Sequence, residues 1–123
     1  MEAVATRETV GNCDVAACTS RAVLVHLAGK WAALIMRTLS RGERRYSEIR
    51  VAIEGISEKM LAQTLRDLEK DGLVLRTSFP VVPPHVVYNL TPLGEECARH
   101  VATLVGWIED HVIELRTARG TDM

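Results

Sequence analysis

Lysine, glutamine and arginine side chains recur at helical spacing within residues 57–71. At about 100° per residue they lie within about 40° of the pole opposite Leu61, Leu65 and Leu68. This surface, the recognition ridge, consists of Lys59, Gln63, Arg66 and Lys70. In the major groove of DNA, arginine or lysine binds guanine and glutamine binds adenine. The ridge therefore predicts contacts with base edges, although a solvated amphipathic helix would show the same pattern.

The charge next to the recognition ridge favours DNA as its partner. Residues 37–50 contain five Arg and two Glu, a net charge of +3, whereas residues 92–123 contain three Arg and six acidic residues. Phosphate contacts from such a basic segment supply much of the affinity for DNA, and base contacts add specificity. Further phosphate or base contacts are expected from Arg44, Arg45, Ser47, Ser57 and Thr64.

The elements that carry the ridge are mainly helical. Apolar spacing predicts a short helix to Leu27, a second helix over 30–40 and a short third helix with Ser47 as its N-cap. Ser57 is then the N-cap of the ridge helix, and Gly72 ends it.

Beyond Gly72 the pattern changes to short strands. Residues 73–79 and 85–90 are rich in β-branched and aromatic residues, and the intervening prolines predict a hairpin with a stiff tip. Thr91 begins a long helix over 92–116, whose apolar stripe is long for so small a domain to cover. The fold class predicted is mainly α with a small β-hairpin, arranged as a winged helix-turn-helix.

Length and composition limit the remaining possibilities. A chain of 123 residues forms one domain, expected over 18–117 between a flexible arm (1–17) and a tail (118–123). The recognition helix is expected at about 57–71 and the wing at about 73–90. There is no apolar run of membrane-spanning length and no signal-peptide pattern, so the chain is expected in the cytoplasm. No enzyme motif, cofactor motif or metal-ligand spacing stands out.

Five segments, in this order, resemble the HxlR-type family of bacterial winged-helix transcription regulators. They are "GKWAALIMRTL", "RRYSEI", "GISEKMLAQTLRDLEKDGLVLR", "PVVPPHVVYNLT" and the helix that contains Trp107, and the resemblance extends over residues 18–115. It implies a homodimer in which the first and last helices (the latter about 92–116) act as dimerisation helices and cover the apolar stripe. Two recognition helices would then read an inverted repeat in double-stranded DNA, with half-sites about 34 Å apart.

The wing departs from the family pattern. The resemblance leads us to expect an acidic residue, a basic residue and a glutamate where this chain has Val81, His85 and Val87. His85 would contact phosphate weakly and in a pH-dependent way. The alternative is a stiff loop with an exposed histidine.

The resemblance also implies a thiol sensor, because many members look like regulators with a cysteine at the start of the first helix. The family spacing assigns this position to Cys18, and a helix N-terminus with Arg21 nearby should lower the pKa of its thiol. Cys13 could act as a resolving thiol after reaction with an oxidant or electrophile. An ordinary cytosolic cysteine is the alternative. Cys97, on the apolar stripe, is expected to be buried and inert.

The function predicted is a homodimeric, sequence-specific DNA-binding transcription regulator, switched by thiol chemistry at Cys18. Two alternatives remain open. One is a winged-helix module that binds proteins, and the other is a regulator that responds to a non-covalent small-molecule effector. The recognition ridge favours DNA over a protein partner, because a protein-binding module has no need of it.

Overall fold

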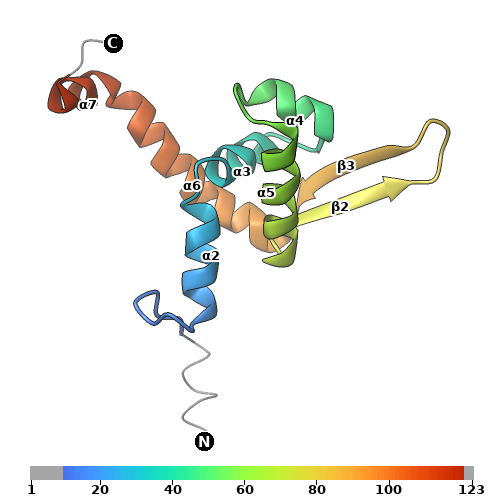
Figure 1. The fold of residues 1–123 in the computed structure, drawn as a ribbon, viewed down its shortest axis with the longest axis horizontal. Helices are drawn as coiled ribbons and strands as arrows, with labels where there is room; N and C mark the ends of the chain where they lie inside the picture. Colours follow the sequence, from blue (N-terminus) through green and yellow to red (C-terminus); the bar gives the residue numbers. More distant parts are fainter. Residues whose placement is uncertain (1–9, 121–123) are drawn as a thin grey trace, which may run out of the picture.

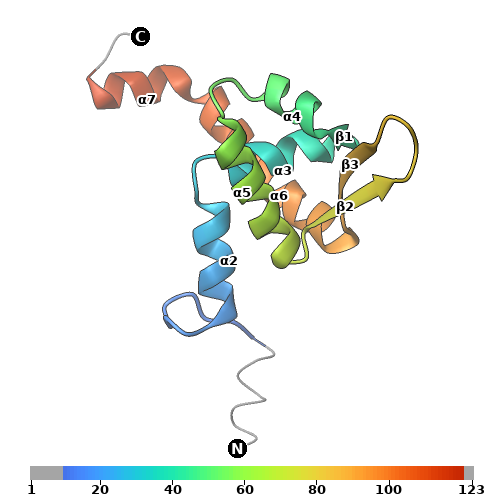
Figure 2. The same ribbon diagram turned by 45° about the vertical axis from the view of Figure 1, so that its right-hand side comes forward.

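The computed structural model describes residues 10–120, which form a group of helices with a small sheet that projects to one side (Figure 1). The elements follow in the order α2 (Thr19–Leu27), α3 (Ala32–Ser40), β1 (Arg44–Arg45), α4 (Tyr46–Ala52), α5 (Glu58–Lys70), β2 (Val74–Phe79), β3 (His85–Leu90), α6 (Pro92–Asp110) and α7 (Val112–Arg119). The mainly helical winged helix-turn-helix predicted from the sequence is confirmed. Figures 1 and 2 show α2 and α7 projecting from opposite ends of the body.

The sheet has three antiparallel strands in the order β1-β3-β2. Strands β2 and β3 form the predicted hairpin, in register from Val74 opposite Leu90 to Phe79 opposite His85. The sequence interpretation missed β1, in which Arg44 pairs with Tyr88. Two arginines have little strand signal of their own, and they are extended because the open edge of β3 supplies hydrogen-bond partners.

An aliphatic core packs between α3, α4 and α5. Its largest fully buried side chains come from these three helices: Ile35, Met36, Ile49, Leu61, Leu65 and Leu68. Each such side chain contributes about 1.5–3 kcal/mol by leaving water. Because three leucines of α5 fill the core, the opposite face of α5 must point outward, as the spacing predicts.

Two of the three predicted N-caps are confirmed. The Ser57 hydroxyl accepts from the Met60 N–H at 3.1 Å, and the Thr91 hydroxyl accepts from the Gly94 N–H at 2.9 Å. The prediction for Ser47 is wrong, because α4 begins earlier and has Arg45 as its N-cap. There the Glu48 carboxylate accepts from the Arg45 N–H at 2.8 Å, which satisfies the helix start without a serine cap.

The last predicted helix is interrupted at His111, which separates α6 from α7. The His111 ring stacks on Trp107 with centroids 4.4 Å apart, and its Nδ1 donates to the Trp107 carbonyl at 2.8 Å. The His111 backbone N–H donates to the same carbonyl at 3.1 Å, so the ring bond adds to the last helical bond of α6. Among the described residues, no single helix is long and apolar enough to cross a membrane. Within residues 10–120, one bent pair of helices, α2 and α3 at 81°, passes that test together, by length and composition alone.

Two polar contacts and one close approach join the helices to one another and to the wing. The His26 Nδ1 donates to the Asp71 carboxylate at 2.6 Å, which joins the last turn of α2 to the C-cap of α5. Arg37 of α3 forms an ion pair with Glu109 of α6 at 2.8 Å. At the start of α6, a Cβ on Gly94 would collide with the Leu73 carbonyl, so the helix can approach the α5–β2 turn only with glycine there.

Candidate nucleic-acid interface

The recognition ridge lies on the outer face of α5, and all four of its side chains are exposed. The neighbouring Thr64 is half-buried, and its hydroxyl donates to the Met60 carbonyl at 2.7 Å. Thr64 therefore lies beside the ridge with its proton already engaged, and it retains only acceptor capacity for a partner.

Hydrogen bonds connect the centre of the ridge to an acidic residue. Arg66 Nη2 donates to Gln63 Oε1 at 3.1 Å, and Gln63 Nε2 donates to Asp67 Oδ1 at 3.0 Å. From spacing alone, Asp67 falls on the flank of α5, away from the ridge. Its carboxylate nevertheless reaches the ridge, because residues four apart are neighbours on a helix surface.

A shallow hollow separates α4 from the start of α5. Ser47 and Ser57 line it from the two helices, together with Arg50. The Arg50 guanidinium forms an ion pair with Glu58 at 3.0 Å, and the Tyr46 hydroxyl donates to the Glu58 carbonyl at 2.7 Å. Two exposed hydroxyls beside a helix N-terminus can donate to a phosphate oxygen.

At the wing, the structure brings together Arg45 and His85. Arg45 Nη2 lies 2.7 Å from His85 Nδ1, and the His85 ring meets Phe79 edge-on with centroids 5.1 Å apart. A guanidinium can only donate, so Nδ1 must accept and the imidazole must be neutral in this arrangement. Arg44 points elsewhere, because its Nη1 donates to the Glu43 carbonyl at 2.9 Å. Arg45 and His85 therefore extend the candidate DNA surface from α5 to the wing.

Cys18 is the N-cap of α2, and it is half-buried beneath a turn formed by the residues before it. The Asn12 N–H points at its sulfur at 3.4 Å, and the Ser20 hydroxyl lies 3.0 Å away. These two hydrogen bonds lower the pKa of the Cys18 thiol, and the bond from the Asn12 N–H has the larger effect. Gly11 lets the turn close, because a Cβ there would meet Ser20 at 2.8 Å.

Arg21 acts differently from the expectation. Its guanidinium donates to the carbonyls of Cys13 at 2.8 Å and Asp14 at 2.9 Å. Arg21 therefore stabilises the turn before α2 and does not act on the Cys18 sulfur as a neighbouring positive charge. The thiol therefore owes its lowered pKa mainly to N–H and O–H donors. The expected arm is folded over 10–17, and its residues 1–9 lie outside the described part.

Comparison with known proteins identifies the family. The HxlR-like helix-turn-helix family matches residues 26–115. The chain is 49% identical to the HTH-type transcriptional regulator YtfH of Escherichia coli, over 89% of this chain and 86% of that protein. The chain belongs to the HxlR-like helix-turn-helix family.

Solved structures agree with this assignment. A YtfH transcriptional regulator from Salmonella typhimurium has 47% identity and a TM-score of 0.84, covering 90% of this chain and 99% of that chain. The redox regulator HypR in its reduced form has 33% identity and a TM-score of 0.72, covering 77% of this chain and 94% of that chain. This HxlR-like chain is therefore a helix-turn-helix transcription regulator and not an enzyme.

Cys97 of this HxlR-like regulator differs from Cys18 in its surroundings. It is half-buried against the core, and burial raises the pKa of its thiol. Within residues 10–120, no group of three or more histidine, cysteine and acidic side chains is placed to hold a metal ion.

The two thiols should therefore react at different rates. At neutral pH, iodoacetamide is expected to alkylate Cys18 about tenfold faster than Cys97, because only the thiolate is nucleophilic and a lowered pKa enlarges its fraction. As the pH is lowered from 9, the Cys97 rate should fall first, since its raised pKa removes its thiolate at higher pH. Peptide mass spectrometry of the Cys13→Ser variant measures both rates, and faster alkylation of Cys97 would contradict the assignment.

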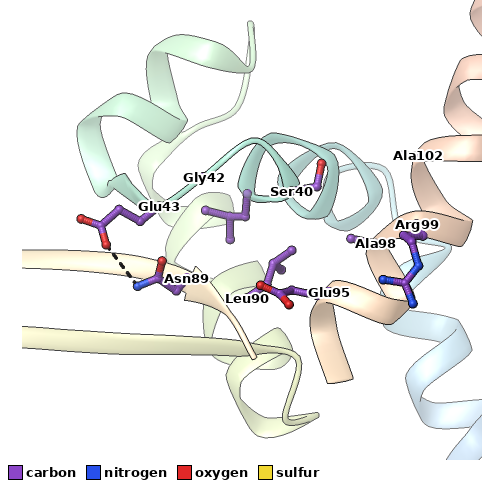
Figure 3. A pocket seen from close by; sticks show the side chains of 10 residues that line it. Ser40, Gly42, Glu43, Asn89, Leu90, Glu95, Ala98, Arg99 and Ala102 are labelled. Carbon is purple, nitrogen blue, oxygen red and sulfur yellow. Dashed lines mark hydrogen bonds between the residues drawn. The ribbon is translucent and has the colours of Figure 1, made fainter. Parts of the chain in front are cut away.

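A cleft of about 470 Å³ lies between the end of α3, strand β3 and the start of α6 (Figure 3). Polar side chains from three elements surround it, and the Asn89 amide donates to the Glu43 carboxylate across one side at 3.4 Å. The other polar side chains that line it are Ser40, Glu95 and Arg99. Donors, acceptors and both charge signs in one cleft can hold a small polar molecule. This cleft could not be predicted from residue patterns, because its lining residues come from segments that are distant in the chain.

Large apolar side chains remain uncovered on α6 and α7. Each of the following is at least 41% exposed: Leu104, Trp107, Ile108, Val112 and Ile113. On α2, Leu24 and Val25 are also exposed. Large apolar side chains exposed in this number are typical of surfaces that contact a partner.

Proposed function

We propose that this HxlR-like regulator is a homodimer that binds an inverted-repeat operator and whose affinity for DNA is switched at Cys18. The observation that carries the proposal is the hydrogen-bonded Cys18 sulfur at the start of α2, in a chain whose recognition ridge is exposed. The relative HypR is a redox regulator, which supports thiol chemistry as the switch. A regulator that acts on bacterial DNA would work in the cytoplasm.

The two subunits would associate through α2, α6 and α7. The uncovered apolar side chains on these helices support this, because a second copy offers the same surface by two-fold symmetry. In each subunit the recognition ridge would enter the major groove. Arg44, Arg45, His85, Ser47 and Ser57 would contact the flanking phosphates, with Thr64 contributing less because its hydroxyl proton is engaged within the protein.

The switching chemistry starts with the Cys18 thiolate. It attacks one oxygen of a hydroperoxide, the O–O bond breaks, and hydroxide or alkoxide leaves as Cys18 becomes a sulfenic acid. The Cys13 thiol then displaces water to form a disulfide. Arg21 holds the Cys13 and Asp14 carbonyls, so this disulfide would rearrange the turn over α2.

Fluorescence anisotropy on duplex DNA from upstream of the gene tests the proposal. Hydrogen peroxide is expected to change the affinity of the wild-type protein about tenfold in one direction, a typical coupling between two sites. The Cys18→Ser variant should bind like the reduced wild type with or without peroxide. Equal responses in both proteins would remove the thiol switch while leaving DNA binding intact.

A second candidate for the switch is the polar cleft. Its mixed lining from α3, β3 and α6 favours a small polar effector. If peroxide has no effect on DNA binding, metabolite mixtures that shift the thermal unfolding of wild-type protein but not of Arg99→Ala would support this alternative.

A further inference from the structure

Gln63 stands at the centre of the recognition ridge with both ends of its amide engaged. Its Oε1 accepts from the Arg66 guanidinium at 3.1 Å, and its Nε2 donates to the Asp67 carboxylate at 3.0 Å. All three residues lie on α5, whose backbone is fixed by the three core leucines on its other face. The chain Arg66–Gln63–Asp67 is thus carried on a rigid support.

The chemistry of the two neighbours permits only one orientation of the amide. A carboxylate has no proton to donate, so it must face the Gln63 nitrogen. A guanidinium has no acceptor, so it must face the Gln63 oxygen. Rotating the amide by 180° would place oxygen against the Asp67 carboxylate and N–H groups against Arg66, and both bonds would be lost.

We infer that Asp67 is a positioning residue, which fixes the orientation in which Gln63 meets a base without itself binding DNA. The inference rests on the proposed binding of DNA by the recognition ridge. Gln63 keeps one N–H and one lone pair for a partner, and adenine requires a donor to N7 and an acceptor from N6. A reversed amide offers these two groups in exchanged places and does not match the same base.

A purely electrostatic role for Asp67 would have a different signature. Removing a carboxylate near phosphates strengthens binding to all sequences alike and steepens the salt dependence. Loss of a positioning bond instead lowers the preference for one base pair in each half-site. The ratio of affinities for two duplexes that differ only at that base pair is therefore insensitive to the charge effect.

The experiment is selection of bound DNA from a pool of randomised duplexes, followed by sequencing. Gln63→Ala first identifies the base pair that Gln63 reads, as the position at which preference disappears. Asp67→Asn should then weaken preference at that same position and leave the others unchanged. Asparagine both donates and accepts, so only the bond to Arg66 still favours one orientation of the Gln63 amide. At most half of the amides then reverse, and a symmetric operator loses up to about fourfold discrimination.

Two further variants control the experiment. Glu69→Gln removes the same charge from the same helix but takes no part in the chain of bonds, so it should leave base preferences unchanged. Asp67→Glu keeps an acceptor-only group and should restore part of the discrimination. Circular dichroism checks that each variant is folded, which is expected because Asp67 is half-buried and lies outside the leucine face that fills the core.

Three outcomes for the Asp67→Asn and Glu69→Gln variants would overturn the inference. The preference at the base pair that Gln63 reads could be unchanged in Asp67→Asn, the preferences at all base pairs could weaken equally, or Glu69→Gln could reproduce the effect of Asp67→Asn. If the wild-type protein enriches no sequence, the proposed function fails and the inference fails with it. If the wild type enriches a sequence and Gln63→Ala alters no position, the inference alone is overturned.

Discussion

Replacing Lys59 and Arg66 with alanine together is expected to reduce operator affinity about a thousandfold. Each contact between a basic side chain and a base is worth about 1–3 kcal/mol, and a dimer would lose four of them. Even at the lower limit the loss is about 4 kcal/mol, or three factors of ten. Both side chains are exposed, so the core leucines on the opposite face of α5 should be unaffected.

Anisotropy titrations at several salt concentrations measure this loss. The slope of log affinity against log salt should become shallower only to the extent that these side chains also neutralise phosphates. A matched double variant, Lys30→Ala with Arg99→Ala, removes the same charge outside α5. If that variant loses as much affinity, the effect comes from net charge and the recognition ridge has no special role.

A carboxylate at Trp107 is expected to separate the dimer into monomers. Trp107 is 52% exposed on α6, in the apolar surface proposed to meet the second subunit. By two-fold symmetry Trp107→Glu would bury two unpaired charges, each of which costs several kcal/mol. Operator affinity should then fall about a hundredfold or more, because a monomer holds one half-site without the second.

Sedimentation velocity at micromolar concentration distinguishes the two states. Leu104→Glu, one turn earlier, should have the same effect without disturbing the stack of Trp107 on His111. Val51→Glu introduces a carboxylate at a side chain that is 86% exposed on α4, and it should leave the oligomeric state unchanged. A wild-type protein that sediments as a monomer would contradict this assembly.

Local signals in the sequence were sufficient for most of the fold. The caps at Ser57 and Thr91 and the leucine face of α5 follow from rules that act within a few residues, and all three are confirmed. Strand β1 was missed because its two arginines become extended only beside β3, more than forty positions further along the chain. The break at His111, whose ring stacks on Trp107, falls within an apolar spacing that continues across it, so the spacing does not report it.

The residue types of the candidate site could be predicted from the sequence, but the hydrogen bonds between those residues could not. Spacing placed Lys59 and Arg66 on one face, yet it could not show that Gln63 is bonded to Asp67, because rotamers decide that contact. Similarly, Arg21 was expected to act on Cys18 through its charge. Its reach to the Cys13 and Asp14 carbonyls depends on the fold of the preceding turn.

The bond between His26 and Asp71 joins the helix that begins at Cys18 to the end of the recognition helix. If that bond transmits a change in α2 to α5, then oxidation of Cys18 and binding of DNA are linked by one coupling free energy. Thermodynamic linkage is reciprocal. Operator DNA must therefore shift the reduction potential of Cys18 by the amount that corresponds to the change in affinity on oxidation. For a two-electron couple, a tenfold change in affinity corresponds to about 30 mV, so promoter-bound regulator and free regulator would respond to different oxidant levels.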